Sequence, residues 1–346
     1  MSEFDAPLRM YLSGDALVAN WRYLKGQGQA DCGAAVKADA YGLGAREVVT
    51  RLRDAGCRDF FVAHWNEAAA IADLVATGSV SVLNGITAAD IPLIRQLGAV
   101  PVLNTPQQIQ LWKAAGGGSC HVMLDSGINR LGIGPTQANA ALFDGLDIDI
   151  LMSHLASADV DSEQNAAQLA TFADMGRDIR STRRSLANSA GIMLGANYHF
   201  DVTRPGLSLY GGIARPEMAG SIRPVVRLSA RILQVRELQM GDRVGYNGTF
   251  TCLTQMRVAT LSIGYADGYL CGFSGIGSVN ANGVEMPVIG RVSMDLVTVD
   301  IGGAPGLTEG DWAEMDYDLP KASAISGLSQ YELLTVVGQR YERVWR

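Results

Sequence analysis

Apolar and polar positions alternate in two different ways along the chain, and the change comes near residue 211. Before it, short apolar runs predict strands, and leucine, alanine and valine recur at helical spacing between them. The predicted strands lie near residues 33–38, 59–64, 80–85, 99–103, 120–126, 148–154, 183–188 and 206–210. The predicted helices cover residues 45–56, 65–78, 88–98, 106–117, 135–145 and 162–180. Eight strands with helical crossovers predict an α/β fold, an N-terminal (β/α)8 TIM-type barrel.

After about residue 220 the pattern is that of strands separated by Gly, Asn and Asp turns. The predicted strand segments are 225–239, 243–250, 256–269, 284–301 and 311–318, and a terminal helix is predicted over 323–340. We therefore expect two domains. The first is the barrel at residues 1–220, and the second is a C-terminal β-rich domain with a terminal helix at residues 221–346.

Nearly every predicted barrel strand ends in a polar or conformationally special residue. The carboxyl ends of parallel barrel strands lie on one face, where enzymes of this fold place their chemistry. We therefore expect these residues to face one cavity. They are Lys37, His64, Asn84, Asn104, Asp125, His154, Asn188, Ser189 and the turn Arg204-Pro205-Gly206.

The composition predicts a folded globular protein, because 48% of the 346 residues are hydrophobic and only 18% are charged. The net charge of −7 includes no basic block, so we expect a small-molecule partner rather than nucleic acid or a membrane. The chain start lacks a signal-peptide pattern, and no apolar stretch reaches the ~20 residues of a membrane span. These features predict a cytoplasmic protein.

Neither the cysteines nor the histidines predict a metal site. The five cysteines are odd in number and far apart, without a CxxC pair, so we interpret them as buried apolar side chains. The histidines show no HxH or HxxxH spacing, which argues against a metal-dependent barrel hydrolase. They are His64, His121, His154 and His199.

Lys37 ends an apolar strand that begins at Cys32, and a buried ammonium group is energetically costly. Taken alone, an ordinary lysine with a counter-ion is the favoured interpretation. The functional alternative is a Schiff base with an aldehyde cofactor, because desolvation lowers a lysine pKa and leaves a neutral nucleophile. Neither GxGxxG nor GxxxxGK[ST] occurs, so Gly42 and Gly44 predict no nucleotide loop.

Several motifs in both predicted domains make a family resemblance specific. They are AAVKADAYGLGA (34–45), LDSGINRLGIG (124–134), MSHLAS (152–157), NSAG (188–191), TRPGLSLYGG (203–212), VGYNGTFT (244–251), SIGYADGY (262–269) and GRVSMD (290–295). In kind and in order they resemble the alanine racemases, pyridoxal-phosphate enzymes with an N-terminal barrel and a C-terminal β domain. The resemblance implies pyridoxal 5'-phosphate as cofactor.

The resemblance also implies roles for individual barrel residues. Lys37 would hold the cofactor as a Schiff base, His154 would stack on its pyridine ring, and Arg130 would bond its phenolic oxygen near the substrate carboxylate. Arg204 would face the pyridine nitrogen. The phosphate ligands would be Tyr41, Ser189, Gly206 and Leu207. Taken singly, a core histidine and ordinary turn glycines explain His154 and Gly206 equally well.

The same resemblance implies two acid/base groups, Lys37 on one face of the substrate Cα and Tyr246 on the other. A free tyrosine is a weak base at neutral pH, so His154 or Arg204 would have to stabilise its phenolate. A strand tyrosine packed on the β domain is the structural alternative. Met294 and Asp295 would contact the substrate carboxylate, and Tyr265 would lie at the entrance.

Arg204 bears on the type of reaction. An arginine stays protonated, so it donates to a pyridine nitrogen without protonating it, and the ring becomes a weaker electron sink. Related barrel decarboxylases place a carboxylate there instead. Arg204 therefore favours brief removal of the Cα proton over decarboxylation, although a salt-bridged barrel arginine is the alternative.

Two positions depart from the family pattern. Met123 stands where many members have a lysine, so something else must orient Arg130. Gln339 stands where some members have a tyrosine that contacts the phosphate, and Tyr341 could replace it only after a register shift. The second departure concerns a region that bears on substrate size.

Together these features predict an alanine racemase that interconverts L-alanine and D-alanine and supplies D-alanine for peptidoglycan. The alternatives are a serine or broader-specificity amino-acid racemase of the same family, and a non-catalytic pyridoxal-phosphate barrel protein. The last class typically lacks the β domain. The resemblance further implies a homodimer in which Tyr246, Tyr265 and Met294 complete the partner's site.

Overall fold

The computed structural model describes residues 5–346, which form two compact units. The first is Ala16–Arg223. The second consists of Pro224–Arg346 together with the described residues up to Asp15. The N-terminal strand thus belongs to the β-rich unit, although it is far from that unit in the sequence.

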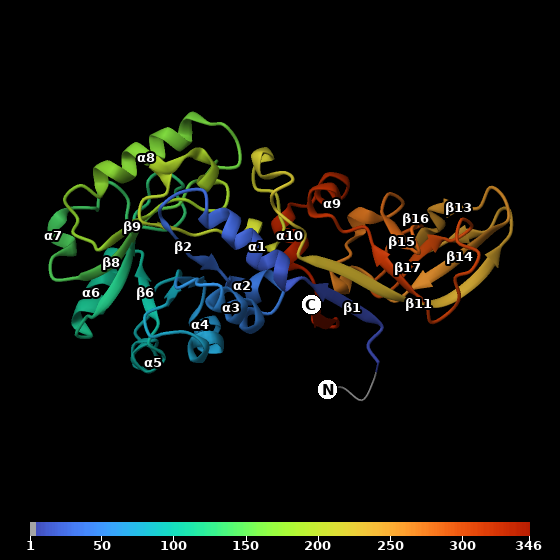
Figure 1. Cartoon of the computed structure of the whole chain (residues 1–346), viewed down its shortest axis with the longest axis horizontal. Helices are drawn as coiled ribbons and strands as arrows, with labels where there is room; N and C mark the ends of the chain where they lie inside the picture. The colour runs from blue at the N-terminus through green and yellow to red at the C-terminus, as the bar shows by residue number, and fades with distance from the viewer. Residues whose placement is uncertain (1–4) are drawn as a thin grey trace. The chain divides into compact units, whose positions relative to one another are not determined.

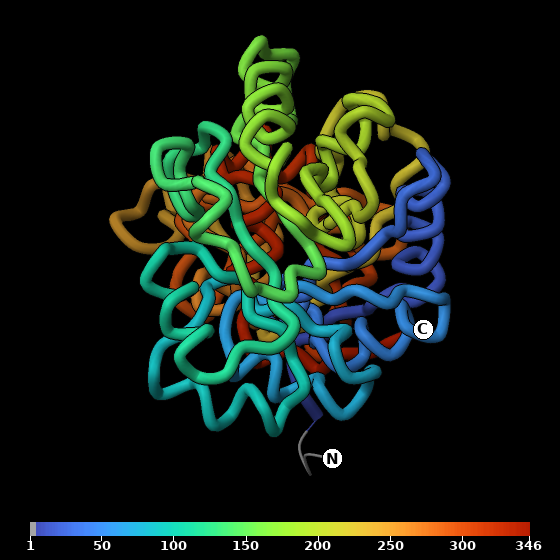
Figure 2. Tube along the Cα trace, turned by 90° about the vertical axis from the view of Figure 1, so that its left-hand side faces the viewer, coloured from blue at the N-terminus to red at the C-terminus, as the bar shows by residue number. Residues whose placement is uncertain are grey.

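Parallel strands form the centre of the first unit (Figures 1 and 2). They are β2 (Asp31–Cys32), β3 (Ala34–Ala35), β4 (Phe60–Val62), β5 (Val80–Val82), β6 (Val100–Leu103), β7 (Ser119–Met123), β8 (Asp147–Met152), β9 (Arg183–Ser185) and β10 (Val202–Thr203). Strands β3 to β9 pair in chain order, and β10 pairs with β2. The N–H groups of Asp201 and Arg204 donate to the carbonyls of Arg184 and Ala187, at 3.0 and 2.8 Å, and join β10 to the β9 run. These bonds close the ring, and in Figure 2 the colours follow chain order around it.

Helices follow the strands and lie outside them (Figure 1). They are α1 (Gly14–Lys25), α3 (Ala45–Asp54), α4 (Trp65–Ile71), α5 (Ile91–Leu97), α6 (Pro106–Ala114), α7 (Ala140–Phe143) and α8 (Glu163–Met175). Capping residues in the sequence determine where some of these helices begin. Thr105 and Ser162 accept hydrogen bonds from the first turns of α6 and α8. All six predicted helices are present, and α1 is an addition.

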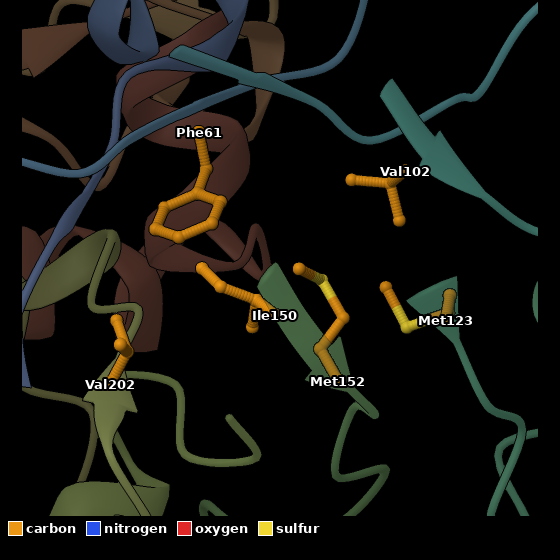
Figure 3. Packing of buried hydrophobic residues seen from close by; sticks show 6 residues of the cluster. All are labelled: Phe61, Val102, Met123, Ile150, Met152 and Val202. Carbon is orange, nitrogen blue, oxygen red and sulfur yellow. The ribbon is translucent and has the colours of Figure 1, made fainter. Parts of the chain in front are cut away.

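Apolar side chains fill the inside of the ring. Figure 3 shows six of them, from β4, β6, β7, β8 and β10, pointing toward one another, and each is at most 7% exposed. They are Phe61, Val102, Met123, Ile150, Met152 and Val202. Because this core is packed, ligands can be held only beyond the strand ends.

The last predicted barrel strand was misplaced. Residues 207–210 form a short 3-10 helix, η4 (Leu207–Tyr210), and the eighth strand is β10 just before it. All four residues of η4 are buried. The Tyr210 hydroxyl donates to Ala35 O at 2.8 Å, and Asn20 Nδ2 donates to Leu209 O at 3.2 Å. Residues 207–210 are therefore mostly apolar because they are buried next to the strand ends, and not because they form a strand.

The second unit is built on a mostly antiparallel sheet in the order β14-β17-β16-β15-β18-β11-β1-β19, with β14 also paired to β11. Its strands are β1 (Leu8–Leu12), β11 (Val226–Leu238), β14 (Met256–Leu261), β15 (Ser278–Ala281), β16 (Val284–Ile289), β17 (Val297–Asp300), β18 (Trp312–Met315) and β19 (Glu342–Trp345). A small hairpin joins β12 (Arg243–Val244) to β13 (Phe250–Thr251). The predicted fold class, a barrel followed by a β-rich domain, is confirmed.

The predicted single terminal helix is two helices. Helix α9 (Leu319–Ser326) ends at Gly327 in the left-handed region, with φ 73°, and Ser329 caps the start of α10 (Gln330–Thr335). The chain then enters β19. Within residues 5–346, no helix has the length and apolar character needed to cross a membrane.

Candidate active site

Lys37 begins a backbone turn of unusual conformation, α2 (Lys37–Tyr41). The four residues after Lys37 all have φ between 52° and 56°, in the left-handed region that costs ~1–2 kcal/mol per residue without glycine. One carboxylate binds the start of this turn, and a second, within the turn, binds the start of α3 (Ala45–Asp54). Ala38 N–H donates to Glu67 Oε1 at 2.6 Å, and Ala45 N–H donates to Asp39 Oδ1 at 2.7 Å.

The Lys37 side chain is open to solvent at the carboxyl end of the barrel, yet protein surrounds it closely enough to perturb its ammonium group. Desolvation lowers the pKa of Lys37 below its usual value, and the positive charge of Arg130 lowers it further. The carboxylate of Glu67 acts in the opposite direction. A larger fraction of Lys37 is therefore neutral, as a base or amine nucleophile requires.

His154 follows β8 and shares its surroundings with three cations. Burial, followed by the charges of Arg204, Arg130 and Lys37, lowers the pKa of His154 to about 3. The imidazole is therefore neutral at physiological pH. Lys37, His154 and Arg204 follow the strands β3, β8 and β10, and Arg130 lies in the loop after β7. The charges of the three cations all act on His154.

Arg204 is buried beside the barrel core. Its Nη2 donates to Ser153 O at 2.5 Å, and its Nη1 donates to the Ser185 hydroxyl. None of the ion pairs formed among residues 5–346 includes Arg204. Burial lowers the pKa of Arg204 to about 10, so it is still a cation at neutral pH. The alternative of a salt-bridged barrel arginine does not apply.

A tight cradle lies where the chain leaves β10. The Ser189 hydroxyl accepts hydrogen bonds from the N–H groups of Gly206 at 2.9 Å and Ser208 at 3.3 Å. A Cβ at Gly206 would lie 2.4 Å from the Tyr41 hydroxyl oxygen. The Tyr41 ring in turn packs on Tyr210, with centroids 4.8 Å apart. Tyr41, Ser189 and Gly206 thus meet at one place, and Leu207 is buried next to them.

The loop that carries Arg130 is organised by Asp125. The Asp125 carboxylate accepts the N–H groups of residues 127 to 130 at 2.9 to 3.1 Å, so it fixes the backbone of Arg130. Met123 lies in the barrel core (Figure 3) and offers no polar partner. Among residues 5–346 the guanidinium of Arg130 makes no hydrogen bond of its own, so its position depends on the loop.

In the second unit, three predicted site residues are exposed on neighbouring loops. Tyr246 is 72%, Met294 52% and Tyr265 40% exposed, although all three are large side chains with apolar surface. Tyr265 N–H donates to Ser293 O and Ala266 N–H to Met294 O, both at 3.0 Å. The backbone at Gly245, next to Tyr246, packs against Arg291. The sequence motifs therefore meet on one face of this unit.

An ion-pair network holds these loops together. Arg340 bonds the buried Asp267 and the exposed Asp295, at 2.7 Å each. Asp267 also accepts the N–H of Gly264 at 3.0 Å. Asp295 is thus paired within its own chain. Sequence reasoning missed Arg340 and Asp267, although Asp267 lies inside the SIGYADGY motif.

Tyr341 belongs to the interior of the second unit. It is 5% exposed, and its hydroxyl donates to Asp267 O at 3.1 Å. Its hydroxyl is therefore engaged within the unit, while Gln339 is exposed.

The expected single cavity is only partly present. His64 and Asn84, 3.3 Å apart, line a cavity of about 350 Å³ at the ends of β4 and β5, together with Trp65, Thr87, Asp90 and Gln108. The residues around Lys37 do not line it. Asn104 is fully buried, and its side chain donates to Leu83 O and Val102 O. It therefore joins the ends of neighbouring strands and does not face a cavity.

A barrel with a cation-rich lysine site at its strand ends, followed by a β-rich unit with clustered tyrosines, defines a class of two-domain barrel enzymes. Residues 12–214 match the family pattern described as "Alanine racemase, N-terminal domain", and residues 225–345 match "Alanine racemase, C-terminal domain". The chain belongs to the alanine racemase family.

Curated relatives and solved structures agree with this assignment. The alanine racemase of Methylobacterium nodulans is 40% identical, over 97% of this chain and 95% of the relative. A protein named "Alanine racemase, catabolic" from Agrobacterium fabrum is also 40% identical, over 95% of this chain and 89% of the relative. The crystal structure of alanine racemase from Bartonella henselae with covalently bound pyridoxal phosphate has a TM-score of 0.92 and 33% identity, covering 99% of this chain and all of that one.

Proposed function

We propose that this protein interconverts L-alanine and D-alanine with pyridoxal phosphate as its cofactor. The observation that carries the proposal is the convergence of Lys37, Arg130, His154 and Arg204 at the carboxyl ends of the barrel strands. The relatives named alanine racemase support alanine as the substrate. The Bartonella henselae structure, which contains pyridoxal phosphate, supports the choice of cofactor.

The residues present fit pyridoxal phosphate. The cradle at Gly206 has no room for a side chain, and the Ser189 hydroxyl, which accepts the N–H groups of Gly206 and Ser208, keeps its own hydrogen to donate to a phosphate. Tyr41 and Leu207 would complete that site. Lys37 would hold the aldehyde carbon, and Arg204 would donate to the ring nitrogen. His154 would lie against the ring, and Arg130 would bond the phenolic oxygen. When bound, the cofactor withdraws electrons from the substrate Cα and so makes its proton acidic.

Racemisation requires that a proton leave one face of Cα and that another arrive on the opposite face. We propose that the Lys37 amine serves one face and the Tyr246 hydroxyl the other. The lowered pKa of Lys37 favours its neutral form, which accepts the proton. The Arg204 guanidinium keeps its own proton, because its pKa of about 10 lies well above physiological pH. It therefore limits delocalisation of negative charge and favours racemisation over decarboxylation.

The test of this function is the loss of both cofactor attachment and activity in Lys37→Ala. Lys113→Ala is the matched control, because Lys113 lies on α6 and bonds Leu142 O. Borohydride reduction followed by mass spectrometry should show a covalent cofactor adduct in the wild type and the control only. Near-normal racemisation by Lys37→Ala would refute the assignment of Lys37.

We further propose a homodimer in which Tyr246, Tyr265 and Met294 serve the partner's Lys37. These side chains, and Leu296 at 41%, are exposed in the single chain. Soluble monomers seldom expose such clusters of large apolar side chains, which supports the proposal that a second subunit covers them. Mixing inactive Lys37→Ala with inactive Tyr246→Ala protein tests the sharing. A mixed dimer would hold one intact site, so activity should return. No return of activity, once mass-tagged subunits are shown to exchange, would refute shared sites.

The proposed cellular role is supply of D-alanine for peptidoglycan from the cytoplasm. A bacterial strain that requires D-alanine should grow without it when it expresses this chain. The Lys37→Ala variant is the control and should not restore growth. Growth that still depends on added D-alanine, despite soluble expression, would contradict the role.

A further inference from the structure

The proposed function does not explain what enforces the unusual backbone conformation of the turn after Lys37. Four consecutive residues without glycine, Ala38 to Tyr41, adopt left-handed backbone angles. Such conformations persist only where the surrounding structure enforces them, and they concentrate at functional sites. The turn fixes both Lys37 at its start and Tyr41 at its end, so whatever enforces it also positions both residues.

Glu67 is the residue from outside the turn that binds its first peptide group. It lies in the first turn of α4, after the second barrel strand, 29 residues from Ala38 in sequence. One carboxylate oxygen accepts Ala38 N–H at 2.6 Å. The other accepts the N–H groups of Ala63 at 2.7 Å and His64 at 3.2 Å. One side chain thus ties the end of the first strand to the end of the second.

The position of Glu67 also gives it an electrostatic role. The groups that face Lys37 are Arg130 from the loop after β7, His154 from the end of β8, and Glu67 from α4. Arg130 is a cation and His154 is neutral. Glu67 is therefore the carboxylate whose charge opposes that of Arg130 at the Lys37 ammonium.

We propose that Glu67 is a positioning residue for Lys37, because its carboxylate anchors the left-handed turn and places a negative charge beside the ammonium group. It acts through the backbone and the local field rather than on substrate. The inference deepens the proposed function, since the purpose of a positioned Lys37 rests on that function. The capping of α4 by the same carboxylate is the purely structural alternative.

The test is a pH titration of Lys37 in the full chain without cofactor. The chain has only the lysines Lys25, Lys37, Lys113 and Lys321, so reductive methylation with ¹³C-formaldehyde gives few NMR signals. The Lys37→Arg variant assigns the Lys37 signal by its absence. Glu67→Gln keeps the size of the side chain and removes its charge. Since the carboxylate stabilises the ammonium form, Glu67→Gln should move the Lys37 titration midpoint to lower pH.

Glu47→Gln is the matched control. Glu47 lies on α3 and pairs with Arg51 on the helix surface, so its loss should leave the Lys37 midpoint unchanged. A midpoint that is the same in Glu67→Gln, Glu47→Gln and wild type would overturn the proposal, even if Glu67→Gln lowers the melting temperature. That combination would leave Glu67 as a helix cap only.

A second measurement covers the backbone part of the proposal. Glu67→Asp keeps the charge but shortens the side chain, so its carboxylate should no longer reach both Ala38 and Ala63. Amide hydrogen exchange at Ala38 should become at least about tenfold faster, as expected for loss of a charge-assisted bond. Unchanged exchange in Glu67→Asp would overturn the anchoring role. Both measurements use protein without cofactor, so they test Glu67 separately from whether the chain racemises alanine.

Discussion

Replacing Gly206 with alanine tests whether the cradle at the end of β10 is as tight as the structure shows. The added Cβ would lie 2.4 Å from the Tyr41 hydroxyl oxygen and 3.0 Å from its ring carbon Cζ. Tyr41 cannot easily move aside, because it is 6% exposed and its ring packs on Tyr210. Its backbone is also in the left-handed turn that carries Lys37.

The expected cost is that of overpacking a filled site, about 1–3 kcal/mol. For a domain of this size, each kcal/mol lowers the melting temperature by about 2–4 °C. The same displacement of Tyr41 should weaken binding of pyridoxal phosphate, because Tyr41 and Gly206 belong to the proposed phosphate site. Thermal unfolding without cofactor and fluorescence titration with pyridoxal phosphate measure the two effects.

Gly134→Ala is the control, because a Cβ at Gly134 meets nothing within 4 Å and needs no left-handed backbone. In the double variant Tyr41→Phe/Gly206→Ala, removal of the hydroxyl relieves the shorter contact, so its stability loss should be less than the sum of the two single losses. Equal melting temperatures and cofactor affinities in Gly206→Ala and Gly134→Ala would refute the reasoning.

Two further predictions concern charge inside the barrel. Arg204→Glu should slow racemisation and add slow conversion of alanine to pyruvate, because a carboxylate favours a protonated ring nitrogen where a guanidinium does not. Wild-type racemisation without pyruvate would show that Arg204 is structural. His121 and His154 have pKa values lowered to about 4 and about 3, chiefly by burial, so the unfolded chain binds more protons than the folded one below about pH 6.5. The free energy of unfolding, measured with urea, should therefore fall between pH 6.5 and 4, and less so in His121→Asn; the same slope in both proteins would argue against this cause.

The barrel could be predicted because each of its strands and helices has a recognisable pattern in its own stretch of sequence. Apolar runs with polar ends and capped helical segments gave seven of the eight strand positions. The eighth was misplaced because Leu207–Tyr210 is apolar for a reason other than strand formation, namely burial under Asn20 and Ala35. A short buried run does not distinguish a strand from a 3-10 turn.

The missed elements depend on contacts that are distant in sequence. Strand β1 pairs with β11 and β19, more than two hundred residues away, and nothing near Leu8–Leu12 indicates this. The left-handed turn after Lys37 is equally hidden, because Ala38 and Ala40 are not residues that favour positive φ.

The sequence motifs singled out Lys37 and Arg204, and their site roles stay predictions. The supporting residues were not predictable. Asp125 was expected as a residue at a strand end, but its role in fixing the Arg130 loop became evident only from its four hydrogen bonds. Glu67 had one weak signal, an acidic residue three positions after His64 at a helix start.

The most direct test of the central claim is to follow the optical purity of alanine in both directions with the purified protein and pyridoxal phosphate. Starting from pure L-alanine and from pure D-alanine, chiral chromatography should show both samples approaching equal amounts of the two enantiomers, because enantiomers have equal free energy. Lys37→Ala should change neither sample. Unchanged optical purity in both samples, with pyridoxal phosphate bound to the wild-type protein, would contradict the account.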